Sequence, residues 1–374
     1  MRILVAPDKF AGTLTAVEAA EAIAEGWRRT APHDEVITAP MADGGPGFVD
    51  VLHNRLGGEL LAVTVRGPLG DPVPATFLRV GESAYIESAQ ACGLALLPKK
   101  ADGRTPVEGV ALDATTYGVG ELVAHAVESG ATRVVVGLGG SGTNDGGAGL
   151  LAALGAVGVP ADALTSGPNG LAALTALDLA EARRRVEGVE LIAASDVDNP
   201  LLSLRGATSI FGAQKGIVDQ AAKLGADAAL ARLADLADRP TADAKGAGAA
   251  GGLGYALLVL GGRREPGFGT VSDALGVPEL IAAADLVITG EGKLDWSSMG
   301  GKVATALAQL AAPAMRPCIA LAGVVEVGNR ELRANGLEAA YSMADAVGHE
   351  AALAEPARNL AALAERVAKT WSRR

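Results

Sequence analysis

The chain has 374 residues, a formal net charge of −11 and a pI near 5.0. So acidic a composition lacks the Lys/Arg surface that a phosphate backbone requires, which excludes nucleic acid as a main partner. No charge-free apolar stretch reaches about 18 residues and the N-terminus lacks the apolar core of a signal peptide, so neither a membrane span nor a secretion signal is predicted.

The predicted elements begin with strands and helices in alternation. In the first part of the chain they are strand 2–6, helix 16–29, strand 35–39 and helix 48–55. Three strands then follow closely across turn sequences, at 60–65, 73–80 and 83–87, and are expected to be antiparallel. Further elements are strands 133–136 and 190–194 and an amphipathic helix at 219–238. The last are strand 285–289, helix 302–310, strands 318–322 and 339–343, and helix 350–371.

This order predicts an α/β protein of two domains, which also suits the length. Two N-terminal and three C-terminal strands predict a doubly wound parallel sheet of flavodoxin-like order, in a discontinuous domain of residues 1–65 and 283–374. Residues 66–282 are predicted to form an inserted α/β domain with a mixed sheet. Apolar residues make up 49% of the chain and aromatic residues only 3%, so the cores must consist of Ala, Val, Leu and Ile.

Five polar or glycine-rich segments follow predicted strands. They are 6–15 (APDKFAGTLT), 40–45 (PMADGG), 137–149 (GLGGSGTNDGGAG), 195–200 (SDVDNP) and 290–295 (GEGKLD). Ligands of open α/β sheets bind at the carboxyl ends of the strands, so five such loops with acidic residues predict one large polar cleft. The alternative is that these residues only form turns and helix caps, where Asp and Asn are common.

Segment 137–149 contains seven glycines and matches G-x-G-x-x-G. A dinucleotide site is one interpretation, but it needs an acid about 20 residues further on, at the end of a strand. Asp162 lies at that distance in a poor strand sequence. We favour a helix N-terminus that faces an anion, with Asp145 on a metal ion that bridges phosphates. There is no G-x-x-x-x-G-K-[ST] segment, which excludes a Walker-type loop.

Other segments add groups suited to phosphate chemistry. Residues 246–254 (GAGAAGGLG) and 300–302 (GGK) could hold phosphates, and Lys302 begins a predicted helix, where a cation is unfavourable without an anion nearby. Asp196 and Asp198 alternate after a strand and can share a site, as Mg²⁺ ligands or with one as a general base. The histidines are scattered, so neither a zinc site nor a Ser-His-Asp hydrolase is predicted.

Taken together, these segments resemble the glycerate kinase family. The resemblance runs over nearly the whole chain, through APDKF–GTLTA, PMADGG, IESAQACGLALL, TTYGVGEL, GLGGSGTNDGGAGLLAALG, SDVDNPL, FGAQKG, GAGAAGGLG and ADLVITGEGKLD–GGK. It implies phosphorylation of the 2-hydroxyl of D-glycerate with ATP and Mg²⁺. It also implies an active site in the cleft between two α/β domains.

We predict sixteen site residues: fourteen are carried over by position from the resemblance, and Gly139 and Gly140 are added from segment 137–149. The roles given to them are our own inference. Catalysis falls to Asp196 as the base and to Lys9, Lys215 and Lys302, and the metal ion to Asp145 and Asp198. Substrate and nucleotide binding falls to Asp8, Asp43, Gly139, Gly140, Ser141, Asn144, Asn199, Gln214, Glu291 and Asp295. The expected partners are small molecules, ATP and glycerate, with neither nucleic acid nor membrane. A monomer or homodimer in the cytoplasm is expected, in keeping with only two cysteines, Cys92 and Cys318.

Four positions depart from the family pattern. Ala11 stands where a lysine is common, Pro46 where an acid is, Phe48 where a threonine is and Ser297 where a glutamine is. These changes leave open a kinase of another small hydroxy acid. An NAD-dependent oxidoreductase and a sensor without turnover are the remaining alternatives.

Overall fold

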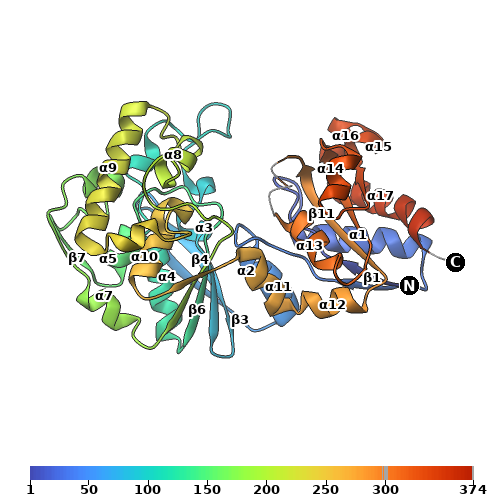
Figure 1. Ribbon diagram of the computed structural model, residues 1–374, viewed down its shortest axis with the longest axis horizontal. Helices are drawn as coiled ribbons and strands as arrows, with labels where there is room; N and C mark the ends of the chain where they lie inside the picture. Colours follow the sequence, from blue (N-terminus) through green and yellow to red (C-terminus); the bar gives the residue numbers. More distant parts are fainter. Residues whose placement is uncertain (297, 299–301, 373–374) are drawn as a thin grey trace. The chain divides into compact units, whose positions relative to one another are not determined.

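In the computed structural model, residues 1–296, 298 and 302–372 are described. The chain forms two compact units (Figure 1). The first unit contains residues 1–43, 50–56 and the chain from 268 onward, and the second contains residues 44–49 and 57–267. Both termini lie in the first unit, so its N-terminal and C-terminal segments build one sheet together (Figure 1).

The first unit has a five-stranded parallel sheet of order β13-β12-β11-β1-β2. Its strands are β1 (Arg2–Val5), β2 (Glu35–Thr38), β11 (Leu286–Leu294), β12 (Cys318–Val325) and β13 (Ala339–Ser342). This is the predicted flavodoxin-like order, which is thereby confirmed. The chain reverses direction across the sheet between β1 and β11, and the carboxyl ends at such a switch point are where ligands of these sheets bind.

Helices cover this sheet. They are α1 (Ala16–Thr30), α11 (Gly267–Leu275), α12 (Val277–Ala283), α13 (Val303–Ala311), α14 (Asn329–Ala334), α15 (Met343–Val347), α16 (His349–Ala354) and α17 (Pro356–Trp371), with α2 (Phe48–Leu56) shared between the units. A capping box starts α1: Thr15 accepts from the backbone N–H of Glu18, and Glu18 accepts from that of Thr15. The apolar faces of α1 and α17 bury Ile3 and Val5 of β1.

Two predicted elements of this unit were wrong in extent. The helix predicted at 350–371 is two helices, because Pro356 has no N–H to donate and disfavours a helical backbone at Glu355, whose φ and ψ are −132° and 63°. The strand predicted at 285–289 continues to Leu294, because β12 pairs with it that far, up to Leu294 opposite Val325. Glu291 therefore lies on a strand rather than in a loop.

The second unit has a sheet of order β10-β9-β6-β5-β4-β3, which is mixed, as predicted. Its strands are β3 (Glu59–Arg66), β4 (Pro72–Val80), β5 (Ser83–Glu87), β6 (Arg133–Gly137), β9 (Glu190–Ala194) and β10 (Arg263–Glu265), and β7 (Val157–Val159) and β8 (Ala176–Asp178) form a separate pair. Strands β3, β4 and β5 are antiparallel, and β5, β6, β9 and β10 are parallel.

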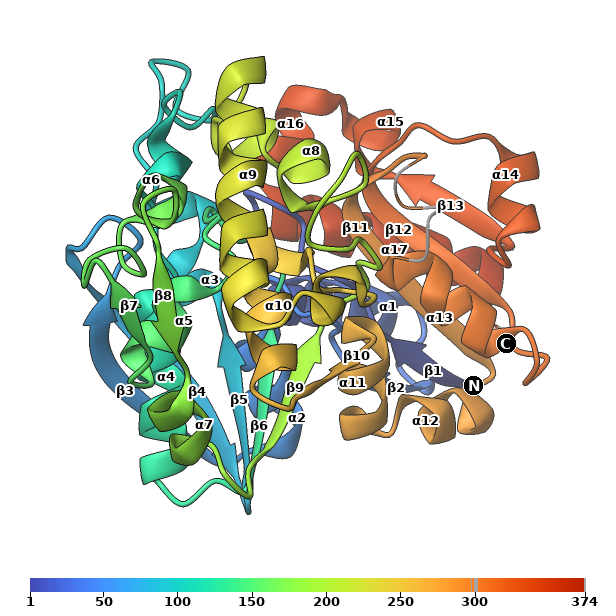
Figure 2. The same ribbon diagram turned by 60° about the vertical axis from the view of Figure 1, so that its left-hand side comes forward.

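Its α-helices are α3 (Ala89–Cys92), α4 (Tyr117–Glu128), α5 (Ala148–Ala153), α6 (Gly167–Leu171), α7 (Ala180–Arg185), α8 (Ala207–Phe211), α9 (Gln220–Ala237) and α10 (Leu253–Val259). Five short 3₁₀ turns join them: η1 (Leu94–Leu96), η2 (Val110–Leu112), η3 (Ala213–Lys215), η4 (Pro240–Asp243) and η5 (Ala249–Gly252). The long helix α9 is the amphipathic helix predicted at 219–238, and α8 lies beside it (Figure 2).

The predicted domain boundaries at 65/66 and 282/283 need correction. Strand β3 belongs to the second unit, because its whole length pairs with β4, from Glu59 opposite Arg79 to Arg66 opposite Pro72. The helix α12, predicted in the inserted domain, packs against β1 and α13 of the first unit. Backbone pairing and apolar contacts, rather than the end of a sequence pattern, set these limits.

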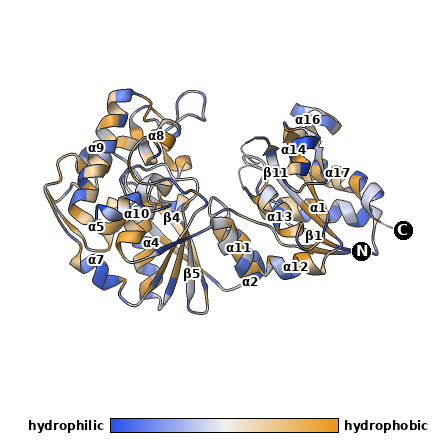
Figure 3. Cartoon of the chain, in the orientation of Figure 1, coloured by the Kyte–Doolittle hydropathy of each residue, from blue (hydrophilic) through white to orange (hydrophobic). Residues whose placement is uncertain are grey.

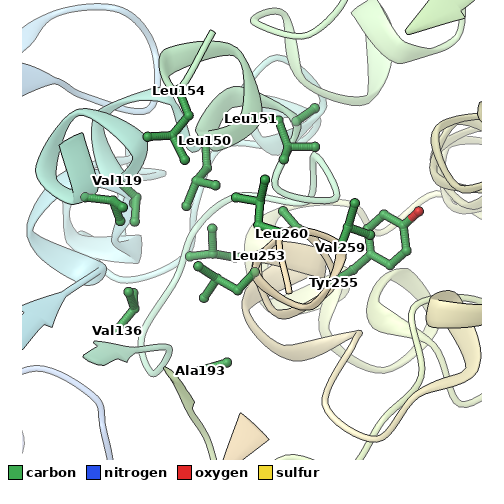
Figure 4. Packing of buried hydrophobic residues seen from close by; sticks show 14 of the residues in the cluster. Val119, Val136, Leu150, Leu151, Leu154, Ala193, Leu253, Tyr255, Val259 and Leu260 are labelled. Carbon is green, nitrogen blue, oxygen red and sulfur yellow. The ribbon is translucent and has the colours of Figure 1, made fainter. Parts of the chain in front are cut away.

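The core of the second unit consists of aliphatic side chains, as the composition predicts. Val119 of α4, Val136 of β6, and Leu150 and Leu154 of α5 are fully buried in it. Figure 4 shows them with side chains of α10, including Leu253, and Figure 3 shows the strands as the most hydrophobic segments. This packing fixes the carboxyl ends of β6 and β9, from which the polar loops emerge. Among the described residues, no helix is long and apolar enough to span a membrane.

Candidate active site

The predicted site residues fall into two groups, one in each unit. In the first unit they line a pocket of about 420 Å³ at the carboxyl ends of β1 and β11. Its polar lining includes Asp8, Lys9, Asp43, Glu291, Asp295 and Lys302, and its apolar lining Phe10, Val324, Met343, Ala352 and Leu353. All six polar residues were predicted from the sequence, and the structure brings them together at the switch point of the sheet.

Asp8 and Lys9 lie at the centre of this pocket. The Nζ of Lys9 is 3.5 Å from Asp8 Oδ1 and 3.9 Å from Asp43 Oδ1, and Asp8 Oδ1 also accepts the backbone N–H of Lys9 at 2.7 Å. Burial raises the pKa of Asp8 to about 6; the charge of Lys9 opposes the shift and that of Asp43 adds to it. A carboxylate that is hard to ionise alone is well suited to take up a further cation.

Glu291 is the second buried acid of the pocket. Burial raises its pKa to about 7, with Asp8 and Asp295 adding to the shift and Ser298 and Lys302 opposing it. Its buried Oε1 has no hydrogen-bond partner among the described residues. An unsatisfied carboxylate oxygen costs free energy unless a ligand or cation completes it. The pocket thus has an open acceptor of its own.

Lys302 and the start of α13 provide the positive side of this pocket. Lys302 is the N-cap residue of α13, and its own side chain makes no capping hydrogen bond. The first backbone N–H groups of a helix without a side-chain cap can bind an anion, and the helix dipole favours one there. The predicted role of Lys302 beside phosphate groups therefore remains open to test. Gly300 and Gly301, predicted to assist it, lie outside the described residues.

In the second unit, the predicted residues Gly139, Gly140, Ser141, Gln214 and Lys215 line a pocket of about 160 Å³. The rest of its wall is mostly apolar, with Leu94, Leu138, Val197, Phe211 and Ala250. Ser141 and the glycines come from the loop after β6, and Gln214 and Lys215 come from η3. Tertiary packing thus joins segments that lie more than seventy positions apart, since Ser141 and Lys215 differ by 74.

Lys215 is 1% exposed, which is unusual for a lysine. Its Nζ donates to Ser141 Oγ at 3.0 Å and to the carbonyl oxygen of Thr143 at 2.6 Å. Burial lowers the pKa of Lys215 to about 8, against the opposing fields of Cys92 and Asp145. Burial therefore disfavours the charged form of Lys215, which an anion site needs. A bound anion or a nearby carboxylate would offset this cost.

Asp145 does not fit its predicted role as a metal ligand. It is fully buried, and its Oδ2 accepts from the backbone N–H groups of Thr116 and Gly149 and from the hydroxyl of Thr116. Its Oδ1 accepts from the N–H of Gly147. Burial raises the pKa of Asp145, and these N–H donors oppose the shift. The oxygens already join the loop at Gly147–Gly149 to the segment at Thr116, so Asp145 stabilises the loop.

Asp198 and the two asparagines also have structural partners. Asp198 is exposed and pairs with Arg264 at 2.8 Å and with Lys245 at 3.3 Å, so its two oxygens face cations of the protein itself. Asn199 donates to the carbonyl of Arg205, and Asn144 donates to Thr208 Oγ1. The prediction that Asp198 binds the metal ion is therefore not supported by the geometry. No group of three or more His, Cys, Asp or Glu residues able to hold a metal is found among the described residues.

Asp196, predicted as the base, differs from its neighbour. It is exposed, and it precedes Val197, which lines the small pocket of the second unit. Its loop is shaped by the hydroxyl of Ser195, which accepts the N–H of Val197 at 3.2 Å. Asp196 is thus an exposed residue next in sequence to a residue of that pocket, and its role as the general base stays a prediction.

The glycines of segment 137–149 have a packing role. A side chain at Gly139 would place its Cβ 2.4 Å from the Cα of Gly45, and at Gly140 it would lie 2.8 Å from Pro46 Cδ. The segment after β6 therefore lies directly against the segment that precedes α2. Gly139 and Gly140 line the pocket through their backbone, but close approach of two chain segments is what excludes side chains there.

We expect Gly139→Ala to destabilise the protein by about 1–3 kcal/mol, because the new methyl group overlaps backbone atoms that cannot move independently. Urea unfolding of the purified variant measures this. Gly225→Ala is the matched control: Gly225 lies in α9 with no atom near its Cβ position, and alanine there should stabilise the helix by up to about 1 kcal/mol. Equal midpoints for the two variants would contradict the packing role.

The four residues that depart from the family pattern lie in different parts of the chain. Ala11 lines the pocket of the first unit. Pro46 packs on Gly140, beside the pocket of the second unit. Phe48 is fully buried and contacts the ring of Tyr85 edge-on, with centroids 6.3 Å apart, so it is a core residue. Ser297 lies outside the described residues.

His349 was missed by the sequence reasoning. It starts α16 and lines the pocket of the first unit, although no polar loop motif surrounds it. The apolar walls of both pockets were missed for the same reason: Phe211, Val324 and Leu353 look like ordinary core positions in the sequence. Only the folded sheet brings them beside the polar loops.

The dinucleotide interpretation of segment 137–149 is not supported. The strand before Asp162 is β7, which pairs only with β8 and is no part of the sheet that contains β6. The helix after β6 begins at Ala148, well past the first glycines. A dinucleotide fingerprint needs a tight turn directly into the helix and an acid on the next strand of the same sheet, and neither is present here.

The fold and the pockets define an α/β enzyme that handles small anions, with acids and lysines on a flavodoxin-like unit and a buried lysine on a mixed-sheet unit. The family model of the glycerate kinase family matches residues 3–372, and the chain belongs to this family. The predicted family is therefore confirmed.

Named relatives agree. The chain is 38% identical to a glycerate kinase of Bacillus subtilis, with 97% of each protein covered. It is 38% identical to the glycerate 2-kinase of Escherichia coli, over 93% of this chain and 92% of that protein. The crystal structure of a candidate glycerate kinase 2 from Salmonella typhimurium LT2 has a TM-score of 0.81 at 36% identity, covering 99% of this chain and 98% of that one.

Proposed function

We propose that the protein is a glycerate 2-kinase, which transfers the γ-phosphoryl group of ATP to the 2-hydroxyl of D-glycerate and releases ADP and 2-phosphoglycerate. Membership of the glycerate kinase family supports the reaction class. The observation that carries the proposal is the pocket at the switch point of β1 and β11. It combines four carboxylates, three lysines (Lys9, Lys293 and Lys302) and an apolar wall in about 420 Å³.

The nucleotide is proposed to bind in this pocket of the first unit. Its volume lies within the range of about 300–1,000 Å³ that is common for small-molecule sites. The apolar side chains of Val324, Met343 and Leu353 would contact the base, and Lys9, Lys302 and the start of α13 would contact the phosphates. The pocket thus offers separate apolar and charged regions, as a nucleotide requires.

Magnesium is proposed to reach the site with the nucleotide. Mg²⁺ is commonly held by one or two carboxylates together with substrate phosphates and water, so a cage of three protein ligands is not needed. Asp8 and Glu291 fit this part, because both are buried acids with raised pKa values and Glu291 has an open oxygen. The bound ion would offset the charge of the phosphates during transfer.

Asp196 is proposed to act as the general base. It would take the proton of the 2-hydroxyl as that oxygen attacks the γ-phosphorus. The bond from the γ-phosphorus to the β–γ bridging oxygen then breaks, and the electron pair leaves with ADP. Its exposure on the loop beside Val197 supports this role, and the neighbouring Asp198 forms ion pairs with Arg264 and Lys245.

A coupled assay of ADP release with D-glycerate and MgATP tests the reaction itself. We expect turnover that depends on both substrates, with 2-phosphoglycerate as the product identified by NMR. Product carrying the phosphate on the 3-hydroxyl would contradict the proposed regiochemistry. A well-folded enzyme that binds MgATP without turning over D-glycerate would contradict the proposed substrate.

We expect Asp8→Asn and Glu291→Gln each to weaken the binding of MgATP by about tenfold or more, because each removes a charge from the proposed ion site. Calorimetric titration with MgATP measures this without any turnover. Glu25→Gln is the matched control, because Glu25 pairs with Arg29 and both are absent from the pocket lining. Unchanged affinity in both site variants would remove Asp8 and Glu291 from the nucleotide site.

A kinase of a different small hydroxy acid is the second candidate, and Ala11 is the observation that favours it. Ala11 lines the pocket of the first unit at a position where the family commonly has a lysine. Loss of that cation would change how a phosphorylated or acidic group is held. Rates with D-glycerate, L-glycerate, glycolate and tartronate, compared at equal enzyme concentration, decide between the two. We propose the cytoplasm as the location, since Cys92 and Cys318 are free thiols.

A further inference from the structure

The ammonium group of Lys215 is held at the edge of a small pocket by two fixed partners. Ser141 Oγ and the carbonyl oxygen of Thr143 accept two of its N–H bonds. An ammonium group has three such bonds, and Lys215 lines the pocket, so the third is available to a molecule bound there. Because Ser141 Oγ already accepts from Lys215, its own O–H can also donate into the site.

Among the described residues, no carboxylate forms an ion pair with Lys215. The titratable groups that face it are Asp145, whose field raises the lysine pKa, and the thiol of Cys92, whose pKa burial raises to about 12. The oxygens of Asp145 are taken up by backbone N–H groups and threonine hydroxyls rather than by the lysine. A buried cation without a paired anion is costly, and a bound anion would offset that cost.

The surrounding backbone is arranged to support this group. Gly251 packs against the carbonyl of Thr143, since a Cβ there would lie 2.0 Å from that oxygen. Ala250, which lines the pocket, has a left-handed backbone with φ of 53° and ψ of 36°. Residues other than glycine adopt this conformation at a cost of about 1–3 kcal/mol and do so most often at functional sites.

The size of the pocket limits what the anion can be. A volume of about 160 Å³ corresponds to roughly five water molecules at about 30 Å³ each. That is room for a small organic acid, and it is too little for a nucleoside triphosphate. The walls of Leu94, Val197 and Phe211 are apolar, so a short carbon chain fits beside the charged end.

We propose that this pocket of the second unit binds the carboxylate of the acceptor substrate, with Lys215 and Ser141 as its direct ligands and Gln214 at its side. The assignment rests on the proposed glycerate kinase function and adds to it a subsite for the carboxylate. It makes the enzyme selective for hydroxy acids over neutral alcohols. It also separates the two substrates, with the nucleotide held by residues of the first unit.

The test compares wild-type enzyme with Lys215→Met, which keeps the length and burial of the side chain while removing its charge. Calorimetry with D-glycerate and with its neutral amide, D-glyceramide, gives the binding constants. We expect the wild type to prefer D-glycerate about 100-fold, and Lys215→Met to bind the two about equally. Ser141→Ala is a smaller change. It should weaken the binding of D-glycerate about tenfold and leave the binding of D-glyceramide nearly unchanged.

Three controls accompany this comparison. Lys245→Met removes a highly exposed lysine of the same unit and should leave D-glycerate binding unchanged. Affinity for MgATP should stay within about threefold of the wild type in every variant. Thermal unfolding within a few degrees of the wild type shows that a loss of binding comes from the site.

The pH dependence gives an independent readout. Burial places the pKa of Lys215 near 8, below the usual value, so the free lysine is charged below pH 8 and neutral above it. The affinity for D-glycerate should therefore fall about tenfold per pH unit above 8 in the wild type. In Lys215→Met the affinity should not change over the same range. Cys92 and Asp145 are present in both proteins, so they cancel in the comparison.

The outcomes separate the subsite from the reaction. Wild-type affinity for D-glycerate in Lys215→Met would overturn the proposal, as would a selective loss of MgATP binding, which would assign the pocket to a phosphate group. Carboxylate binding that depends on Lys215, without turnover of glycerate, would support the subsite and contradict the proposed substrate. Turnover of glycerate with an unchanged KM in Lys215→Met would support the proposed substrate and contradict the subsite.

Discussion

Asp145→Ala is expected to lose about 5 kcal/mol or more of the free energy of unfolding. The change removes the acceptor for the N–H groups of Thr116, Gly147 and Gly149 in a site without access to water. Each buried donor left without a partner costs about 1–3 kcal/mol. The free energy of unfolding of a typical domain is only about 5–15 kcal/mol in total, so little soluble folded protein should remain.

Urea unfolding followed by circular dichroism measures the effect, and a graded pair of variants makes it specific. Asp145→Asn keeps one acceptor oxygen and should cost clearly less than alanine. Asp235→Ala removes one partner of the exposed pair with Arg239 and should change stability by less than about 1 kcal/mol. If Asp145→Ala unfolds like the wild type but needs more Mg²⁺ for turnover, the metal role predicted from the sequence would be restored and the structural role rejected.

Asp196→Asn is expected to lower kcat by about 10²–10⁴-fold, which is the usual contribution of a positioned general base. The amide keeps the size of the side chain but cannot accept the proton of the 2-hydroxyl. Because Asp196 is exposed on a loop, stability should change little. The KM for D-glycerate should stay within a few-fold of the wild type, since the carboxylate of the substrate is held elsewhere.

Asp198→Asn is the matched control for this prediction. It lies two positions away on the same loop and pairs with Arg264 and Lys245. Its kcat should stay near that of the wild type. Equal losses for the two variants would indicate that the loop conformation matters rather than a base, and an unaffected Asp196→Asn enzyme would assign proton removal to another group.

Much of the first unit could be predicted because its signals are local. A short apolar strand followed by an amphipathic helix with a capping box, as at Arg2–Val5 and Thr15, needs no distant information. Repetition of this pattern at both ends of the chain gives the flavodoxin-like order. The end of β11 could not be predicted in the same way, because the length of β12 beside it decides where pairing stops.

The acids show the same division. The sequence places Asp145 and Asp198 in polar loops after strands, where they look alike. The structure gives Asp145 partners up to 30 positions away and gives Asp198 an arginine and a lysine from a later segment. These contacts decide which carboxylate oxygens already have partners, and no local sequence pattern predicts them. The contacts of Asp145 and Asp198 do not support their prediction as metal ligands.

By itself, the sequence determined the fold class and the order of the flavodoxin-like sheet, which follow from periodicity, capping and residue spacing over a few neighbouring positions. It also determined the family, through the motifs that resemble the glycerate kinase family. Only the tertiary structure decided which polar groups stay open to ligands. Burial and pairing are properties of the surroundings. Among the described residues they leave Glu291 Oε1 without a hydrogen-bond partner, surround the oxygens of Asp145 with backbone N–H groups, and place Lys215 in a small pocket without an ion-paired carboxylate.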